Sequence, residues 1–111
     1  MNPLPKTTSP VLIVDDDAIL RSLARAALEN DGFTVEEAAD GEEACRVFDA
    51  CRPQLLVVDV VMPGMNGYEL CRAVRSRPVG AHVPILMATG LDDIDSITQA
   101  YEAGATNFIT K

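Results

Sequence analysis

The sequence predicts an α/β fold, in which a doubly wound parallel sheet has helices packed on both faces. Short apolar runs alternate along the chain with longer segments whose apolar residues recur every three or four positions, as in βαβ units. The apolar runs contain few polar residues, which is typical of strands covered on both faces. With 111 residues, 48% of them hydrophobic, the chain is long enough for one core and too short for two domains.

The first strand is expected at Val11–Val14, and a helix follows it. Apolar residues with helical spacing are predicted to form one buried face of this helix, namely Leu20, Leu23, Ala24, Ala27 and Leu28. The pattern ends at Asp31 and Gly32. The segment Phe33–Ala38 is expected to be an edge strand, because polar residues interrupt it.

The remaining elements repeat this alternation. The second helix is indicated by apolar residues that recur until Pro53, namely Ala44, Val47, Phe48 and Cys51. Strands are expected at Leu55–Val58, Pro84–Thr89 and Asn107–Thr110. Two further helices are indicated by the sets Leu70, Ala73 and Val74, and Ile94, Ile97 and Tyr101. Tyr101 is expected to pack rather than to take part in recognition.

Polar residues stand where the predicted strands end. They are Asp15, Asp16 and Asp17 after the first strand, Asp59 after the third, Thr89 and Gly90 after the fourth, and Lys111 after the fifth. In a doubly wound sheet, ligands bind beyond the carboxyl ends of the strands. If the first and third strands are neighbours, Asp15, Asp16 and Asp59 converge there. A hard cation such as Mg²⁺, which takes oxygen ligands, would offset their charge.

These residues also have structural explanations. Acids at the start of a helix cap its free N–H groups, and this would account for the aspartate triplet. Asp59 would begin a turn in the segment MPGMNG, Thr89 with Gly90 would form another turn, and Lys111 would be solvated. Asp92 and Asp93 are expected to cap the fourth helix. The joint placement at one edge of one sheet is what favours a functional site.

Four segments resemble the receiver domain of two-component response regulators. VLIVDDD, LLVVDVVMPGMNG, ILMATG and NFITK stand in the family's order and at its usual separations. The resemblance covers Val11–Lys111 and leaves residues 1–10 as a flexible N-terminal tail. It implies a flavodoxin-like (βα)5 fold with a five-stranded parallel sheet in the order 2-1-3-4-5. It also implies a regulatory switch, not a separate enzyme, that accepts a phosphoryl group from a histidine kinase or a histidine phosphotransfer protein.

The resemblance implies a role for each acid at the strand ends. Asp59 matches the phosphoacceptor, and Asp16 matches a direct Mg²⁺ ligand. Asp15 matches the acid that holds the ion through water, and Val61 would offer its backbone carbonyl to the same ion. Asp17 has no implied ligand role and is expected to cap the helix.

Three further positions match residues that respond to phosphorylation in the family. Thr89 is implied to bond the phosphoryl group and Lys111 to pair with it. Phe108 matches the aromatic switch residue, whose rotamer follows the phosphorylation state. Movement of Thr89 would let Phe108 rotate and change the surface of the fourth helix and fifth strand.

The segment after Asp59 is expected to complete the site. Pro63 and Gly67 would shape the turn that brings the Val61 carbonyl toward the ion, since Pro fixes φ and Gly permits positive φ. In the family, the residues two after the phosphoacceptor and two after the threonine influence attack by water. Here they are Val61 and Leu91, which cannot orient water by hydrogen bonding. We therefore predict slow self-dephosphorylation.

The sequence ends at Lys111, whereas receiver domains usually continue with a fifth helix. Without that helix, part of the flank of the first and fifth strands is expected to be uncovered, an apolar patch that favours self-association such as a homodimer. The surface of the fourth helix and fifth strand, once changed by phosphorylation, is expected to control an output domain or a partner. The segments ATGLDD and AYEAGATNFITK also resemble receivers fused to cyclic-di-GMP synthesis or degradation domains.

The composition opposes several other classes of function. A net charge of −8, from 17 acids against nine bases, disfavours direct binding to nucleic acid or an anionic membrane. Cys45, Cys51 and Cys71 form no CxxC pair and are expected to be free thiols in a reducing compartment. No apolar run approaches the ~20 residues that span a bilayer, and the N-terminus lacks the apolar segment of a secretion signal. We expect a cytoplasmic protein.

Two other functions fit parts of the pattern. A Mg²⁺-dependent phosphatase of the haloacid dehalogenase type also uses an aspartyl nucleophile at a strand end, but it carries a second Asp where this chain has Val61. A flavodoxin-like cofactor binder would share the sheet order, but acids follow the first strand where a flavin phosphate would bind, and no nucleotide P-loop occurs. Catalytic release of phosphate would favour the phosphatase.

Overall fold

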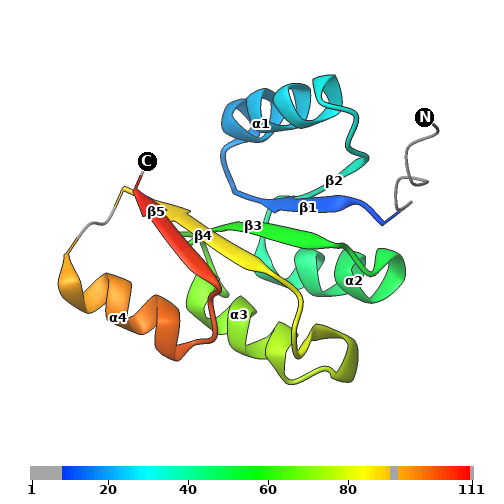
Figure 1. Ribbon diagram of the computed structural model, residues 1–111. Helices are drawn as coiled ribbons and strands as arrows, with labels where there is room; N and C mark the ends of the chain where they lie inside the picture. Colours follow the sequence, from blue (N-terminus) through cyan, green and yellow to red (C-terminus); the bar gives the residue numbers. More distant parts are fainter. Residues whose placement is uncertain (1–8, 91–92, 111) are drawn as a thin grey trace, which may run out of the picture.

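The computed structural model describes residues 9–90 and 93–110. Its five strands form one parallel sheet in the order β2-β1-β3-β4-β5, with helices on both faces (Figure 1). The predicted doubly wound fold and strand order are therefore confirmed. Residues 1–8 of the predicted tail lie outside the described residues.

The strands are β1 (Val11–Val14), β2 (Val35–Ala38), β3 (Leu55–Asp59), β4 (Ile85–Thr89) and β5 (Asn107–Thr110). The helices are α1 (Ala18–Asn30), α2 (Gly41–Cys51), α3 (Gly67–Arg75) and α4 (Ile94–Glu102), with a 3₁₀ helix η1 (Pro78–Gly80) before β4. The second strand begins two residues later than predicted. The reason is that the Phe33 N–H still donates to the Leu28 carbonyl (3.0 Å) and closes the end of α1.

A polar side chain caps the start of each α-helix. The caps are Asp17 for α1, Asp40 for α2, Asn66 for α3 and Asp93 for α4. Each side chain accepts a hydrogen bond from a free N–H of the first turn, which the helix itself cannot satisfy. The predicted capping by Asp17 and Asp93 is confirmed, and Asp92 lies outside the described residues.

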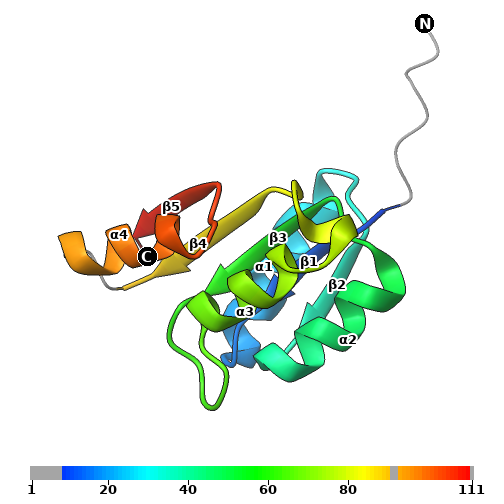
Figure 2. The same cartoon turned by 90° about the horizontal axis from the view of Figure 1, so that it is seen from below.

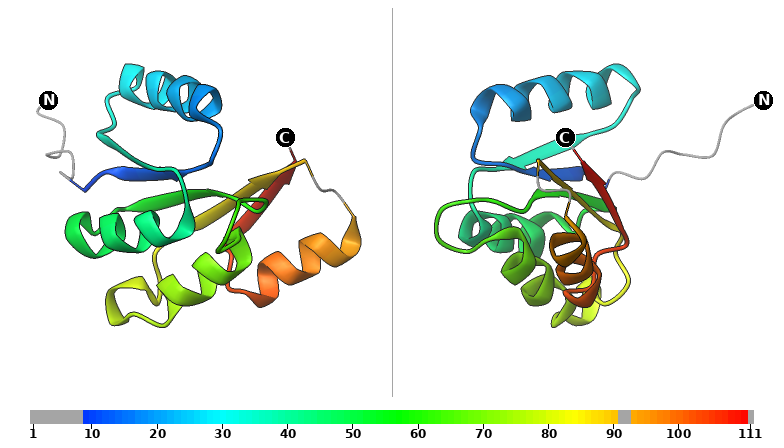
Figure 3. Two further views of the ribbon diagram at one scale, coloured as in Figure 1. Left: turned by 180° about the vertical axis from the view of Figure 1, so that it is seen from behind. Right: turned by 90° about the vertical axis from the view of Figure 1, so that its left-hand side faces the viewer.

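The two faces of the sheet are covered unequally. Helices α2, α3 and α4 pack on one face, and α1 lies on the other face over β1 and β2 (Figures 2 and 3). The core under the three helices is continuous, and its largest fully buried side chains include Phe48, Leu56, Leu70, Ile85 and Met87. The buried cluster under α1 consists of Val11, Ile13 and Val35.

The prediction that α1 has a fully buried face is wrong. Ala24 and Leu28 are half-buried against the small cluster, but Leu20, Ala27 and Leu23 are exposed, Leu23 at 63%. Within the described residues, no second helix lies beside α1 on this face (Figure 3). Among the described elements, the flank of α1 that faces β4 and β5 is therefore not covered by a neighbouring helix.

An open apolar cavity of about 330 Å³ marks this flank. It is lined by Ile13, Val14, Asp15, Leu20, Ala24, Val57, Asp59 and Ala88. On the neighbouring edge strand, Ile109 is exposed. An uncovered apolar patch was expected at this flank.

The predicted packing face of α4 is only partly correct, because Ile97 is half-buried but the other two predicted residues are not. The small residues Ser96 and Ala100 are buried, whereas Ile94 and Tyr101 are exposed. Small side chains let α4 approach its neighbours closely, and the Tyr68 hydroxyl of α3 donates to the Ser96 carbonyl (3.0 Å). Hydrophobic spacing alone misses such a face, because alanine and serine contribute little to the apolar pattern.

The cysteines are free, as predicted. Cys71 is fully buried in the core of α3, and burial raises the pKa of its thiol. It therefore acts as a small hydrophobic residue. Within residues 9–90 and 93–110, no helix combines the length and apolar character that a membrane span requires.

Candidate functional site

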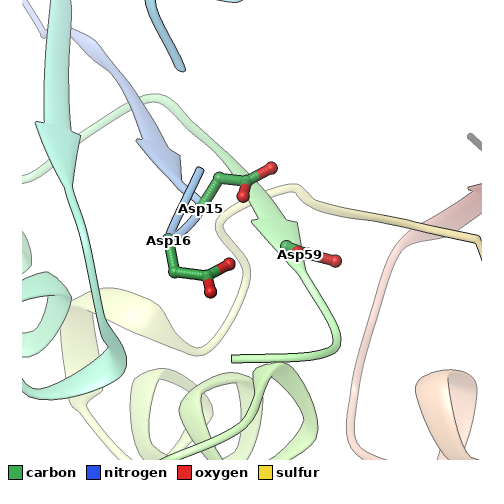
Figure 4. A group of neighbouring side chains, drawn as sticks. All are labelled: Asp15, Asp16 and Asp59. Carbon is green, nitrogen blue, oxygen red and sulfur yellow. The ribbon is translucent and has the colours of Figure 1, made fainter. Parts of the chain in front are cut away.

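Three aspartates gather where β1 and β3 end (Figure 4). One carboxylate oxygen from each of Asp15, Asp16 and Asp59 lies within 4.8 Å of the others. The cause is the register of the sheet, because Val14 pairs with Val58 on the adjacent parallel strand and the acids follow directly. Asp15 and Asp59 are buried, and Asp16 is exposed.

The backbone of Asp15 is held from β2. Its N–H donates to the Ala38 carbonyl (3.2 Å), which continues the pairing of β1 with β2. Its carboxylate accepts a hydrogen bond from the N–H of Asp17 (2.9 Å). Asp17 in turn caps α1, so the loop from β1 to the helix is fixed at both ends.

Asp59 is held by the close approach of the α3 N-terminus. The Gly67 N–H donates to the Val60 carbonyl (2.9 Å), and a Cβ at Gly67 would lie 2.5 Å from the Asp59 carbonyl oxygen. Any other residue at this position would collide with the strand end. The predicted reason for Gly67 is therefore wrong, since the glycine with positive φ in this turn is Gly64 (+73°). Pro63 lies beside it.

Thr89 and Phe108 occupy neighbouring strands on the side of the α2–α4 core. Ala88 pairs with Asp59, which places buried Thr89 one position beyond it on β4. Phe108 pairs with Met87, two residues before Thr89, and is half-buried against the core. The alternation of side chains along a strand puts both residues on one face.

Val61 follows the site in the loop after β3. Its N–H donates to Asp59 Oδ1 (3.4 Å), and the residue is 59% exposed. Lys111 and Leu91, the two other residues with predicted roles here, lie outside the described residues.

The ligand atoms that converge at this edge are all oxygens. Two buried carboxylates and one exposed carboxylate within 4.8 Å suit a hard divalent cation that keeps part of its water shell. The exposure of Asp16 leaves the cluster open to solvent. The arrangement can therefore bind a cation and present a carboxylate nucleophile in one place.

Sequence patterns did not indicate Arg21, which also reaches the site. Its Nη1 donates to the Asp15 carbonyl (2.6 Å), and its Nε donates to Glu37 on β2 (3.1 Å). Arg25 donates to the same carboxylate (2.7 Å) and holds the pKa of Glu37 below its usual value. The spacing offered one signal, because Arg21 lies one helical turn after the cap Asp17.

Comparison with known proteins places this fold and site in a family. Residues 11–111 match the response regulator receiver domain. The chain is 41% identical over 101 residues to the response regulator MprA of Mycobacterium ulcerans (strain Agy99), covering 91% of this chain and 43% of that protein. It is 38% identical over 101 residues to the transcriptional regulatory protein CseB of Streptomyces avermitilis, covering 91% and 42%.

Solved structures agree with the sequence relatives. The chemotaxis protein CheY4 of Vibrio cholerae has a TM-score of 0.91 and 34% identity, covering 95% of this chain and 88% of that one. The chain belongs to the response regulator receiver domains of two-component systems. It is therefore a regulatory domain, and the phosphatase alternative is not favoured. It spans less than half the length of the two curated relatives.

Proposed function

We propose that this domain is a phosphorylation-activated switch whose phosphoacceptor is Asp59. The donor is the phosphohistidine of a histidine kinase or a histidine phosphotransfer protein, and the transfer depends on Mg²⁺. The observation that carries the proposal is the cluster of Asp15, Asp16 and Asp59 at the carboxyl edge of the sheet, in a chain of the receiver family.

Mg²⁺ would be held by oxygen ligands from both strand ends. Asp16 and Asp59 would bind it directly, Asp15 through water, and Val61 through its backbone carbonyl. The ion, when bound, supplies positive charge that stabilises the transferred phosphoryl oxygens. Lys111, outside the described residues, would pair with the same oxygens.

The group that this chain contributes to the bond-forming step is a positioned carboxylate, that of Asp59. An Asp59 oxygen attacks the phosphorus in line, a P–O bond forms, and the P–N bond to the donor imidazole breaks. The imidazole nitrogen keeps the bonding electron pair. Because Asp59 ends a core strand and is packed against Gly67, little orientational freedom is lost when the donor arrives.

Formation of the acyl phosphate on Asp59 would change the positions of side chains on β4 and β5. A phosphoryl group adds roughly −1.5 to −2 charges and three acceptor oxygens. The Thr89 hydroxyl would move toward them, and Phe108 would turn into the space that opens beside β5. Coupling of this kind is typically ~1–3 kcal/mol, enough to shift a population between two states of the α4–β5 surface.

The altered surface would control an output domain or a separate partner. The relatives are longer than this chain, and one of them is a transcriptional regulatory protein, so an attached output domain is the first expectation. An attached domain that makes or degrades cyclic-di-GMP is the second expectation. Self-association through the α4–β5 surface or the open flank is proposed as a further consequence, in a cytoplasmic setting.

Phosphorylation from acetyl phosphate tests the proposal. With Mg²⁺, mass spectrometry should detect one added phosphoryl group on the wild type and on Asp31→Asn, an exposed acid at the end of α1. Asp59→Asn should remain unmodified, and chelation of Mg²⁺ should abolish the labelling of the wild type and of Asp31→Asn. Labelling of Asp59→Asn at the wild-type level would place the acceptor elsewhere. Continuous release of phosphate over many turnovers would instead support a phosphatase.

A further inference from the structure

We infer that Arg21 is a positioning residue that sets the peptide plane between Asp15 and Asp16. The inference rests on the proposed function, because it assigns these two acids to the Mg²⁺ site. Arg21 would not touch the ion. It would act through the backbone that carries the two expected ligands.

The contacts of Arg21 are made inside the molecule. Its side chain is 17% exposed. It donates from Nη1 to the Asp15 carbonyl (2.6 Å) and from Nε to Glu37 Oε1 (3.1 Å). A guanidinium offers these donors in a fixed plane, so the two contacts constrain one another.

The carbonyl of Asp15 belongs to the peptide unit that joins Asp15 to Asp16. The other side of Asp15 is already fixed, because its N–H donates to the Ala38 carbonyl (3.2 Å). Peptide units are planar, so holding the carbonyl oxygen also sets the direction in which the chain leaves toward Asp16. Asp16 is exposed, and packing cannot orient its carboxylate. The contact of Arg21 with the Asp15 carbonyl, together with the hydrogen bond from the Asp17 N–H to the Asp15 carboxylate (2.9 Å), then sets the backbone that carries the Asp16 carboxylate.

Glu37 anchors the guanidinium to the sheet. Glu37 pairs in register with Ile13 on β1, two residues before Asp15. Its second oxygen, Oε2, accepts from Arg25 Nη1 (2.7 Å). Arg25 thus shares the Glu37 carboxylate with Arg21. Its side-chain hydrogen bonds go to Glu37 and Glu29, whereas the Asp15 carbonyl is bonded by Arg21. The chain therefore offers a matched control arginine on the same helix.

Positioning and simple electrostatics predict opposite signs. Arg21 places a positive charge close to the acids, so by Coulomb repulsion its removal would make Mg²⁺ bind more tightly. If Arg21 instead holds the ligands in place, its removal weakens Mg²⁺ binding. Loss of an outer contact that orients metal ligands typically costs about 10–100-fold in affinity.

Mg²⁺ titration of the whole chain, followed by calorimetry and by backbone amide shifts, provides the test. Arg21→Ala and Arg21→Lys should each bind Mg²⁺ about tenfold more weakly than the wild type. Alanine removes both hydrogen bonds, and lysine keeps the charge but lacks the planar set of donors that reaches both partners at once. Glu37→Gln should show a smaller loss in the same direction. Arg25→Ala should bind like the wild type. Thermal melts show which variants are folded, and if Arg21→Ala does not fold, the comparison is made with Arg21→Lys, which keeps the charge and so removes the Coulomb effect from the test.

The outcomes separate the inference from the function beneath it. If the wild type binds Mg²⁺ and the folded Arg21 variants bind it equally or more tightly, the positioning role is overturned and the proposed function stands. An equal loss in Arg25→Ala would also overturn it, because the effect would then come from the Glu37 ion pairs alone. If the wild type does not respond to Mg²⁺, both ideas fall.

Discussion

The face of the sheet under α2, α3 and α4 carries a continuous apolar core, whereas the face under α1 has three buried residues and a group of ion pairs. Both sets of helices have amphipathic sequences with similar spacing. The α1 side chains remain exposed because that side lacks neighbours among the described elements. Burial thus depends on what lies opposite a helix as much as on its own pattern.

The same difference extends to the site. The backbone of Asp59 is held on the face covered by α2, α3 and α4, where the start of α3 packs directly on its carbonyl. Asp15 is held on the side of α1, where Arg21 and the edge strand β2 supply hydrogen bonds to its backbone. The two halves of the expected Mg²⁺ site are therefore held by packing on one side and by polar contacts on the other.

The largest expected effect comes from a matched pair of leucines. Leu70→Ala on α3 removes a fully buried side chain and should lower the free energy of unfolding by about 2–5 kcal/mol. Leu23→Ala on α1, which is 63% exposed, should change it by no more than about 0.5 kcal/mol. Urea unfolding measures both. Equal losses would mean that α1 is covered in solution.

The next largest effect is expected at the contact between α3 and β3. Gly67→Ala forces a Cβ to 2.5 Å from the Asp59 carbonyl oxygen, so about 1–3 kcal/mol of stability should be lost. Phosphorylation by acetyl phosphate should also slow, because the strand end that carries Asp59 must shift. Gly90→Ala is the control, since nothing lies within 4 Å of a Cβ there. Wild-type labelling of a folded Gly67→Ala variant would contradict the proposed role of this contact.

Acid should weaken the ion pairs between α1 and β2. The hydrogen bond from Arg25 lowers the pKa of Glu37 below the ordinary value of 4.5 for a glutamate, so the ion pairs stabilise the fold above that pH. Their contribution is lost as the pH falls through the lower, folded-state pKa. Glu37→Gln should therefore melt at a lower temperature than the wild type at pH 7, and the difference should shrink on acidification. A difference that stays constant with pH would exclude this explanation.

The smallest change in stability is expected at Val61, which is packed on neither face. Val61→Asn should leave the unfolding free energy nearly unchanged but speed the loss of phosphate, because an amide can orient an attacking water near Asp59. Val79→Asn is the control, since Val79 is similarly exposed on η1, before β4. Decay of the phosphorylated wild type within seconds would reject the prediction of slow self-dephosphorylation.

Much of the fold was predictable because the strands carry a strong local signal. Runs such as Val11–Val14 and Leu55–Val58 are apolar throughout, and only a central strand suits them. The acids that follow these runs indicated the edge where Asp15, Asp16 and Asp59 meet. These predictions used short segments and the geometry of parallel sheets, and they needed no knowledge of distant contacts.

The faces of the helices were predicted less well. Periodicity placed Leu20 and Leu23 inside and overlooked Ser96 and Ala100, because spacing reports which residues share a face but not whether another element covers it. Gly67 was identified for the wrong reason. Glycine is required there because a Cβ would collide with the carbonyl oxygen of Asp59, eight positions earlier in the chain.

From local patterns alone, the positions of the apolar strands could be predicted, and so could the acids that follow the first and third strands. Three features became visible only in the folded chain: Arg21 reaches the Asp15 carbonyl, Gly67 packs against Asp59, and one side of α1 is uncovered. The physical reason is that strand formation and capping depend on near neighbours in the chain. Close contacts and burial depend on which surfaces meet once the sheet has formed.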